Sequence, residues 1–206
     1  MAIIHHTTLK PSKLELLTTW LPTRPWYVGE GTPELTKAGG FRLDDPEGEV
    51  GIEFMVVGDA DGVTYLVPLT YRGTPLDGAE HALVGTMEHG VLGKRWAYDG
   101  CHDPVLVAEL FALIEGRAQA QAQSVDNTPD HEIARSYSGP GNLLAHGPAV
   151  DDETGTEITA QDGTTLRLHR RLGLPDAPPP GALGHVSGHW TAQDGTRVRS
   201  LFAELR

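Results

Sequence analysis

The chain has 206 residues, which is enough for one large domain or two small ones with a hydrophobic core. Hydrophobic residues make up 39% and charged residues 21%, as in ordinary soluble globular proteins, and the net charge of −12 argues against binding to nucleic acid or to an anionic membrane. Cys101 is the only cysteine, so no intrachain disulfide can form, and a reducing compartment fits.

The N-terminal region predicts a helix. Residues 1–30 contain no apolar stretch long enough for a signal peptide or a membrane span, so we expect a cytoplasmic protein. Ser12 followed by Glu15 is a capping-box pattern, and leucines at helical spacing follow it, which predicts a helix over Ser12–Leu21. The glycine-rich segment Trp26–Gly40 is interpreted as a loop.

Strand patterns follow. Glu49–Asp59 and Val63–Arg72 are rich in β-formers, and Asp61-Gly62 between them predicts a hairpin turn; the acidic residues there lack the later ligands of a calcium loop. Pro68 cannot donate a ladder hydrogen bond, so we expect an edge or a bulge at that position. Two shorter strands are expected at Leu83–Thr86 and Val91–Tyr98, joined by a turn at His89-Gly90.

A second helix is predicted over Asp103–Gly116. Asp103 can cap it, Pro104 suits its first position, and a broad apolar stripe follows. Gly116 can end this helix; alternatively, the QAQAQ tract extends it as a polar tail. The polar stretch Ser124–Asp130 is interpreted as a linker.

Only strand patterns follow the linker. The hexapeptide TAQDGT occurs at Thr159–Thr164 and again at Thr191–Thr196, and each copy predicts a hairpin turn, with the proline-rich Pro175–Gly181 as a stiff connector between the two hairpins. The sequence thus predicts an α+β fold with antiparallel β-sheets and two main helices. Its expected domains are 1–123 and 131–206, the second a small antiparallel β domain.

Few residues suggest chemistry. No pair among the ten histidines has a metal-ligand spacing with cysteine or acidic partners; His185 and His189, for example, would lie about 13 Å apart along a strand. Cys101 adjoins His102, but neighbouring side chains usually point apart, so an ordinary cysteine is expected. We therefore predict no catalytic residue, no metal site and no cofactor. Tryptophans usually serve the core, but Trp26 and Trp96 are candidates for stacking on sugar rings.

Four segments in order resemble the N-terminal cap domain of maltokinases, over roughly residues 9–115. They read LPTRPWYVG, GIEFMVV, YLVPLTYRGTPL and HGVLGKRWAYDGCHDPVLVAELFALI. Maltokinases are actinobacterial enzymes that phosphorylate maltose for α-glucan synthesis, with a fold like that of protein kinases and aminoglycoside phosphotransferases. The resemblance implies that 1–123 is a cap-like domain and that 131–206 is a remnant of the kinase N-lobe.

The resemblance also implies a candidate anion site. In the kinases an N-lobe strand carries a nucleotide-binding lysine and a pair of arginines. Thr165–Leu172 reads TLRLHRRL, with Arg167 at the place of the lysine. In a strand, Arg167 and Arg171 would share one face and Arg170 would point to the other. Joined by Arg197 or Arg199, Arg167 and Arg171 would form an anion- or nucleotide-binding patch; alternatively, the arginines pair with acidic residues of the N-terminal half.

The kinases take their catalytic aspartate and magnesium ligands from a C-lobe, for which this sequence has no motif. We therefore expect a non-catalytic, stand-alone cap-like protein that binds or scaffolds a protein partner in α-glucan or trehalose metabolism. Two alternatives remain open. One is a component of a split sugar kinase that binds ATP through Arg167. The other is a carbohydrate-binding module that uses exposed tryptophans.

Overall fold

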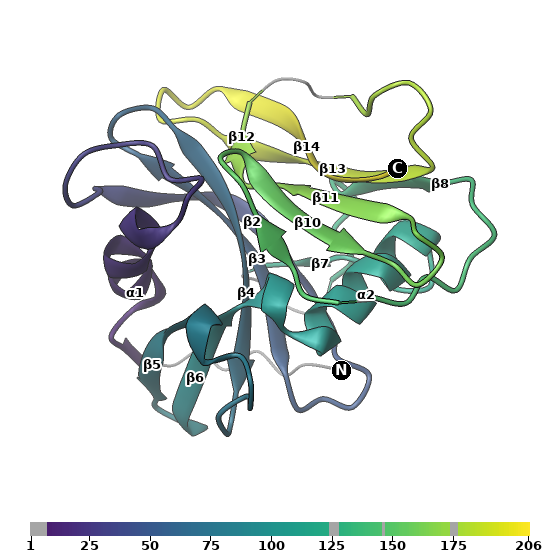
Figure 1. The fold of residues 1–206 in the computed structure, drawn as a ribbon. Coiled ribbons are helices and arrows are strands. Elements are labelled where there is room, and N and C mark those ends of the chain that lie inside the picture. The colour runs from purple at the N-terminus through teal and green to yellow at the C-terminus, as the bar shows by residue number, and fades with distance from the viewer. Residues whose placement is uncertain (1–7, 124–127, 146, 174–176) are drawn as a thin grey trace.

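The computed structural model describes residues 8–123, 128–145, 147–173 and 177–206, and they form an α+β fold (Figure 1). The helices are α1 (Lys13–Trp20), η1 (Leu21–Thr23), η2 (Glu80–Ala82), η3 (Gly100–His102) and α2 (Pro104–Glu115). The strands are β1 (Leu9–Lys10), β2 (Leu35–Leu43), β3 (Gly51–Asp59), β4 (Thr64–Arg72), β5 (Leu83–His89), β6 (Gly93–Asp99), β7 (Gln121–Ala122), β8 (Ala134–Tyr137), β9 (Val150–Asp151), β10 (Gly155–Thr159), β11 (Thr165–His169), β12 (Arg171–Leu172), β13 (Gly184–Thr191) and β14 (Arg197–Leu205).

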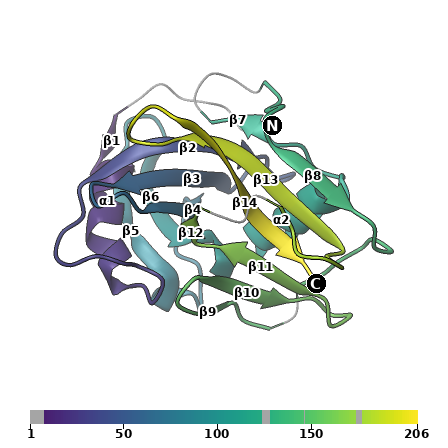
Figure 2. The same ribbon diagram turned by 90° about the horizontal axis from the view of Figure 1, so that it is seen from above.

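The strands that the structure describes form one antiparallel sheet in the order β1-β5-β6-β4-β3-β2-β13-β14-β11-β10-β9, with β7, β8 and β12 attached to β2, β13 and β4. Because β12 directly follows β11 in the chain and pairs with β4, the path from β4 through β3, β2, β13, β14 and β11 returns to β4. These strands therefore close into a barrel, and Figure 2 shows the sheet curling round on itself. Strands from both sides of the predicted linker thus alternate within one sheet.

Pro68 lies at the point where the sheet divides. One edge of β4 pairs with β3 along its length, whereas the other edge pairs with β12 at Thr64 and Tyr65 and with β6 from Leu69 onward. Pro68 falls between these two partners, where no ladder donor is required. Pro68 thus lies where one side of a central strand has no partner. The expected local edge is found at this gap, where the missing N–H of proline leaves no hydrogen bond unmade.

Two hydrophobic clusters lie on opposite faces of the central strands. On β3, Phe54 and Val56 face the barrel core, which also contains the apolar stripe of α2, while Met55 and Val57 face α1. This arrangement explains why β3 is apolar at successive positions instead of alternating: both of its faces are buried. Figure 1 shows α1 and α2 on opposite sides of β2, β3 and β4.

Both predicted helices are confirmed, with their caps. Ser12 and Glu15 form the capping box of α1. Asp103 accepts a hydrogen bond from the backbone N–H of Val105 at the start of α2, and Gly116 ends that helix in the left-handed conformation at φ +85°. The QAQAQ tract therefore does not extend α2; part of it forms β7, which pairs with β2. No helix in the described part of the chain is long and apolar enough to cross a membrane.

The two TAQDGT copies are confirmed as hairpin turns with the same hydrogen bonds. In each copy the alanine N–H donates to the carbonyl of the last threonine, and the aspartate side chain accepts from that threonine's N–H, at 2.9 Å for Asp162 and 2.8 Å for Asp194. The turn at Asp61-Gly62 closes with the corresponding backbone bond, from the Asp59 N–H to the Val63 carbonyl. Part of the predicted linker, 124–127, and part of the proline-rich connector, 174–176, lie outside the described residues.

The expectation of a loop over Trp26–Gly40 was wrong in its second half, where β2 begins at Leu35. Glycines usually break strands, but here Gly40 has φ +131°, and a Cβ atom at this position would lie 2.1 Å from the carbonyl oxygen of Phe54. Only glycine lets β2 approach β3 so closely. The glycine pair that suggested a loop therefore permits the pairing of a central barrel strand.

Candidate functional site

A buried group of polar side chains surrounds Arg170, between β11 and β12. Arg170 is fully buried, and its Nη2 donates to both carboxylate oxygens of Asp99 at 2.7 Å. Its Nε donates to Thr156 Oγ1 at 2.7 Å, and its guanidinium carbon lies 4.9 Å from the ring centroid of Trp26. Burial disfavours the charged guanidinium, but the carboxylates of Asp99 and Asp151 outweigh it and raise the Arg170 pKa. This ion pair thus joins β6 of the N-terminal half to the strands of the C-terminal half.

Asp99 and Asp151 meet a histidine at the same place. Asp99, His102 and Asp151 each offer a ligand atom within 4.8 Å of the others, which makes them the group of described residues able to hold a metal ion. His102 Nδ1 in turn lies 3.2 Å from Nε2 of the exposed His81. Sequence spacing missed this group because Asp151 comes from β9, far along the chain; the only local signal was an aspartate three residues before a histidine.

Arg167 does not form the expected arginine cluster. Its guanidinium donates to both carboxylate oxygens of Asp152 and, at 2.6 Å, to Thr154 Oγ1. The hydrogen bonds from the Arg167 guanidinium are the largest cause that lowers the pKa of Asp152. In the sheet, Arg167 lies opposite Glu204, whereas Arg197 and Arg199 lie further along β14 beside β13. The expected patch therefore does not form, because the register of β14 brings a glutamate, not an arginine, beside Arg167.

Arg171 is partly exposed and belongs to β12, where it lies opposite Tyr65 of β4, whereas Arg167 belongs to β11, which pairs with β10 and β14. Burial does not alternate along β11: Leu166 and Leu168 are fully buried in the barrel core, and Arg167 between them is buried as well. The alternative was that the arginines pair with acidic residues of the N-terminal half. Arg170 does so, because its partner Asp99 belongs to that half.

The two candidate stacking tryptophans have different environments. Trp26 is fully buried among α1, β3 and β4, and its ring contacts Trp20 and Tyr65 at centroid distances of 5.8 and 6.0 Å. A sugar therefore has no access to its faces. Trp96 on β6 is partly buried, and the Nζ of Lys94 lies 4.9 Å from its ring centroid. Of the two candidates, only Trp96 presents surface to solvent.

Cys101 is buried beside this cluster. Burial raises the pKa of its thiol, and the neighbouring Arg170 opposes that shift without cancelling it. The side chain is therefore a thiol and not a nucleophilic thiolate. Its free state agrees with the absence of any second cysteine in the sequence.

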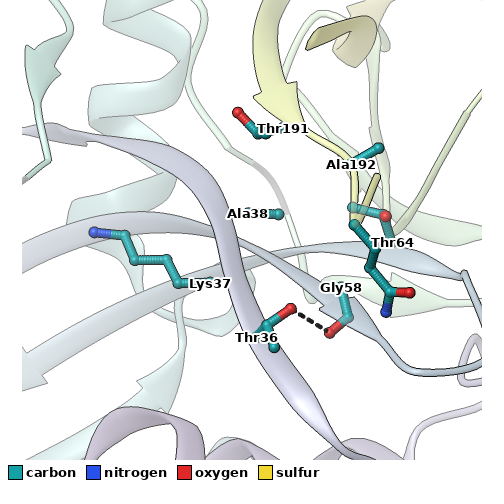
Figure 3. Close-up of a pocket in the computed structure, with 8 residues that line it drawn as sticks. Thr36, Lys37, Ala38, Gly58, Thr64, Thr191 and Ala192 are labelled. Atoms are coloured by element: carbon teal, nitrogen blue, oxygen red, sulfur yellow. Dashed lines mark hydrogen bonds between the residues drawn. The ribbon is translucent and has the colours of Figure 1, made fainter. Parts of the chain in front are cut away.

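A pocket of about 230 Å³ lies at one end of the barrel, between β2–β4 and the β13–β14 turn (Figure 3). Hydroxyl, amide and backbone groups line most of it, from Thr36, Ala38, Gly58, Thr64, Thr191, Ala192 and Gln193, and Lys37 borders it. The Thr36 hydroxyl donates to the Gly58 carbonyl at 3.4 Å. Figure 3 shows the Lys37 side chain pointing away from Gly58 and Thr64. The pocket thus contains no acid–base pair suited to catalysis.

One comparison with known families bears on this arrangement. The matching segment begins at Trp20, the last residue of α1, contains β2–β6, and ends at Asp103, the N-cap of α2. It leaves out β8–β14, which complete the barrel. Over residues 20–103 the chain matches the model of the maltokinase N-terminal cap domain family, which confirms the resemblance that its motifs indicate.

Proposed function

We propose that this chain is a non-catalytic, cap-like binding or scaffold protein that acts with a protein partner in α-glucan or trehalose metabolism. The observation that carries the proposal is the family match over residues 20–103. In this proposal the protein works in an actinobacterial cytoplasm, and the segment 131–206, which completes the barrel, corresponds to the sheet of a kinase N-lobe.

The contacts of the candidate residues support a binding role over a catalytic one. A split kinase would need the Arg167 guanidinium to reach a nucleotide phosphate, but Asp152 and Thr154 already occupy it. The Arg170 guanidinium is buried against Asp99. Both cations are therefore already engaged by carboxylates within the fold, and removing either to bind phosphate would break an ion pair.

A carbohydrate-binding role has less support. Aromatic stacking on a sugar needs an exposed ring face, and Trp26 has none. Trp96 is partly covered by Lys94. One partly exposed tryptophan is a poor platform for a glucan chain, so this alternative ranks below protein binding.

The tip of the β5–β6 hairpin is the surface that we would test for partner binding. Val91 and Leu92 are adjacent there, and their exposed fractions are 61% and 45%. Both residues fall within the segment that matches the cap family. Adjacent apolar side chains at a protruding turn form a small hydrophobic anchor of the kind that protein interfaces bury.

The test measures enzymatic turnover and binding with one preparation. We expect no sugar-dependent ADP release from ATP with maltose, glucose or glucosamine, and no binding of ATP or maltooligosaccharides. We expect direct binding to a purified α-glucan enzyme of the source cell, and loss of that binding in Val91→Asp/Leu92→Asp. Sugar-dependent ADP release would contradict the proposal. ATP binding that Arg167→Ala abolishes would favour the split kinase, and oligosaccharide binding that Trp96→Ala abolishes would favour the carbohydrate module.

A further inference from the structure

The short helix η3 places two metal-binding side chains on one side. Asp99 immediately precedes η3 and His102 ends it, so the two residues are three apart, the spacing at which side chains eclipse in a 3₁₀-helix. Asp151 reaches the same point from β9, and the three ligand atoms lie within 4.8 Å of one another. His102 and Asp151 are only partly buried, which leaves a route for a small cation from solvent.

The charges in this group leave an excess of negative charge. Two carboxylates face one guanidinium: Arg170 bonds to both oxygens of Asp99, and its Nη2 lies 4.0 Å from Asp151 Oδ1. Asp151 Oδ1 also accepts from Thr156 Oγ1. The Arg170 contact resembles the hydrogen bonds that hold metal-ligating carboxylates in place, and the remaining charge of −1 attracts a cation.

A second histidine orients His102. His81 contacts its Nδ1 at 3.2 Å, with the two rings nearly perpendicular at 87°. A second hydrogen bond of this kind fixes the orientation and tautomer of metal-binding histidines. His81 is therefore a positioning residue for His102.

We propose that Asp99, His102 and Asp151 bind a divalent first-row transition metal, with Zn²⁺ as the best fit, and that His81 orients His102. Imidazole nitrogen together with carboxylate oxygen suits zinc, whereas Mg²⁺ and Ca²⁺ prefer oxygen ligands alone. Zinc–ligand bonds of about 2.0–2.2 Å require the three ligand atoms to move closer together. The partly exposed Asp151 and His102 side chains can make that adjustment.

The experiment uses the full chain carrying His5→Ala/His6→Ala, which removes an adjacent histidine pair elsewhere in the sequence. After chelator treatment, we titrate it with Zn²⁺ by calorimetry and expect one equivalent to bind. His102→Ala and Asp151→Asn should abolish this binding. His81→Ala should weaken it by about 10–100-fold, as for other residues that support a ligand. His131→Ala removes an exposed histidine that does not belong to this group, and it should leave the binding unchanged.

Two further measurements make each result decisive. Circular dichroism checks that every variant is folded. If His102→Ala does not fold, Asp151→Asn replaces it as the test of the site, because its side chain keeps an oxygen acceptor for Thr156. The visible absorption of bound Co²⁺ should change when His102 is replaced. The proposal fails if no Zn²⁺ binds, if His102→Ala and Asp151→Asn bind it as tightly as the parent, or if Mg²⁺ binds more tightly than Zn²⁺.

Discussion

At the residue scale, Arg170 is a side chain that links the two halves of the chain. Its guanidinium is fully buried and links Asp99 of the N-terminal half to Thr156 of the C-terminal half. A buried ion pair adds little to stability compared with an apolar pair of the same shape, but the loss of one partner leaves an uncompensated charge. Removing either Arg170 or Asp99 alone should therefore cost far more stability than the ion pair itself contributes.

We expect Arg170→Met to lower the free energy of unfolding by about 3–5 kcal/mol, because Asp99 remains buried without its partner. The double variant Arg170→Met/Asp99→Asn should recover part of that loss. Urea denaturation measures both. Arg197→Ala is the matched control: its pair with Glu132 is exposed, so it should change stability by less than about 1 kcal/mol. Equal losses for Arg170→Met and Arg197→Ala would contradict this account.

Glu53 is the second buried charge whose environment has a measurable consequence. Burial alone would raise its pKa, but the Lys13 ammonium and hydrogen bonds from Lys13, Tyr71 and Gln123 outweigh burial, so the pKa lies below its ordinary value of 4.5. As the pH falls, the unfolded chain therefore takes up a proton at this group before the folded protein does. The stabilisation is fully present above pH 4.5 and is lost as the pH falls through the folded-state pKa.

Glu53→Gln should flatten the stability profile below pH 4.5, because no proton can bind at that position. At neutral pH it should cost about 1.5–3 kcal/mol, the usual contribution of hydrogen bonds to a charged group. Denaturation midpoints measured across the pH range test both statements. A variant profile parallel to that of the parent chain below pH 4.5 would show that Glu53 does not carry this pH dependence.

At the element scale, strand β2 depends on a glycine. Gly40→Ala should destabilise the protein by about 3 kcal/mol, the upper end of the cost of backbone strain, because the new Cβ would meet the Phe54 carbonyl oxygen. Gly48→Ala is the control, with φ +75° and no heavy atom within 4 Å of the added carbon, and it should cost only about 1–2 kcal/mol. Thermal unfolding compares the two; a smaller loss for Gly40→Ala would contradict the close approach of β2 and β3.

Local chemistry explains which elements the sequence could predict. Asp-Gly turns carry their geometry within a few residues, since the aspartate accepts a local backbone hydrogen bond and the glycine takes a positive φ. The capped helices likewise carry their own boundaries. Strand β2 has no such local signal, because its glycines are required by a neighbouring strand and not by a turn.

At the scale of the whole molecule, the boundary expected between 1–123 and 131–206 stays a prediction, and the sheet crosses it. Strand β13 pairs with β2, and β12 pairs with β4. Phe202 of the C-terminal half stacks on Phe41 of the N-terminal half, with ring centroids 6.1 Å apart. The two segments therefore share one core.

We expect the full chain to unfold in a single cooperative transition by calorimetry. A fragment of residues 8–123 would expose the inner face of β2 and leave Asp99 without Arg170, so it should show no cooperative transition at the temperature of the full chain. Two separate transitions in the intact protein, or a fragment as stable as the whole, would establish two independent domains.

The helices, their caps, the Asp-Gly hairpins and the resemblance to the cap domain could be predicted from the sequence, because each rests on neighbouring residues or on ordered motifs. The barrel closure, the partners of the arginines, and the grouping of Asp99, His102 and Asp151 became visible in the folded structure alone. Strand register brings together residues that are distant in the chain, and the pattern of residues along one sequence does not specify that register. Arg167 lies beside Glu204, and Arg170 beside Asp99, for that reason.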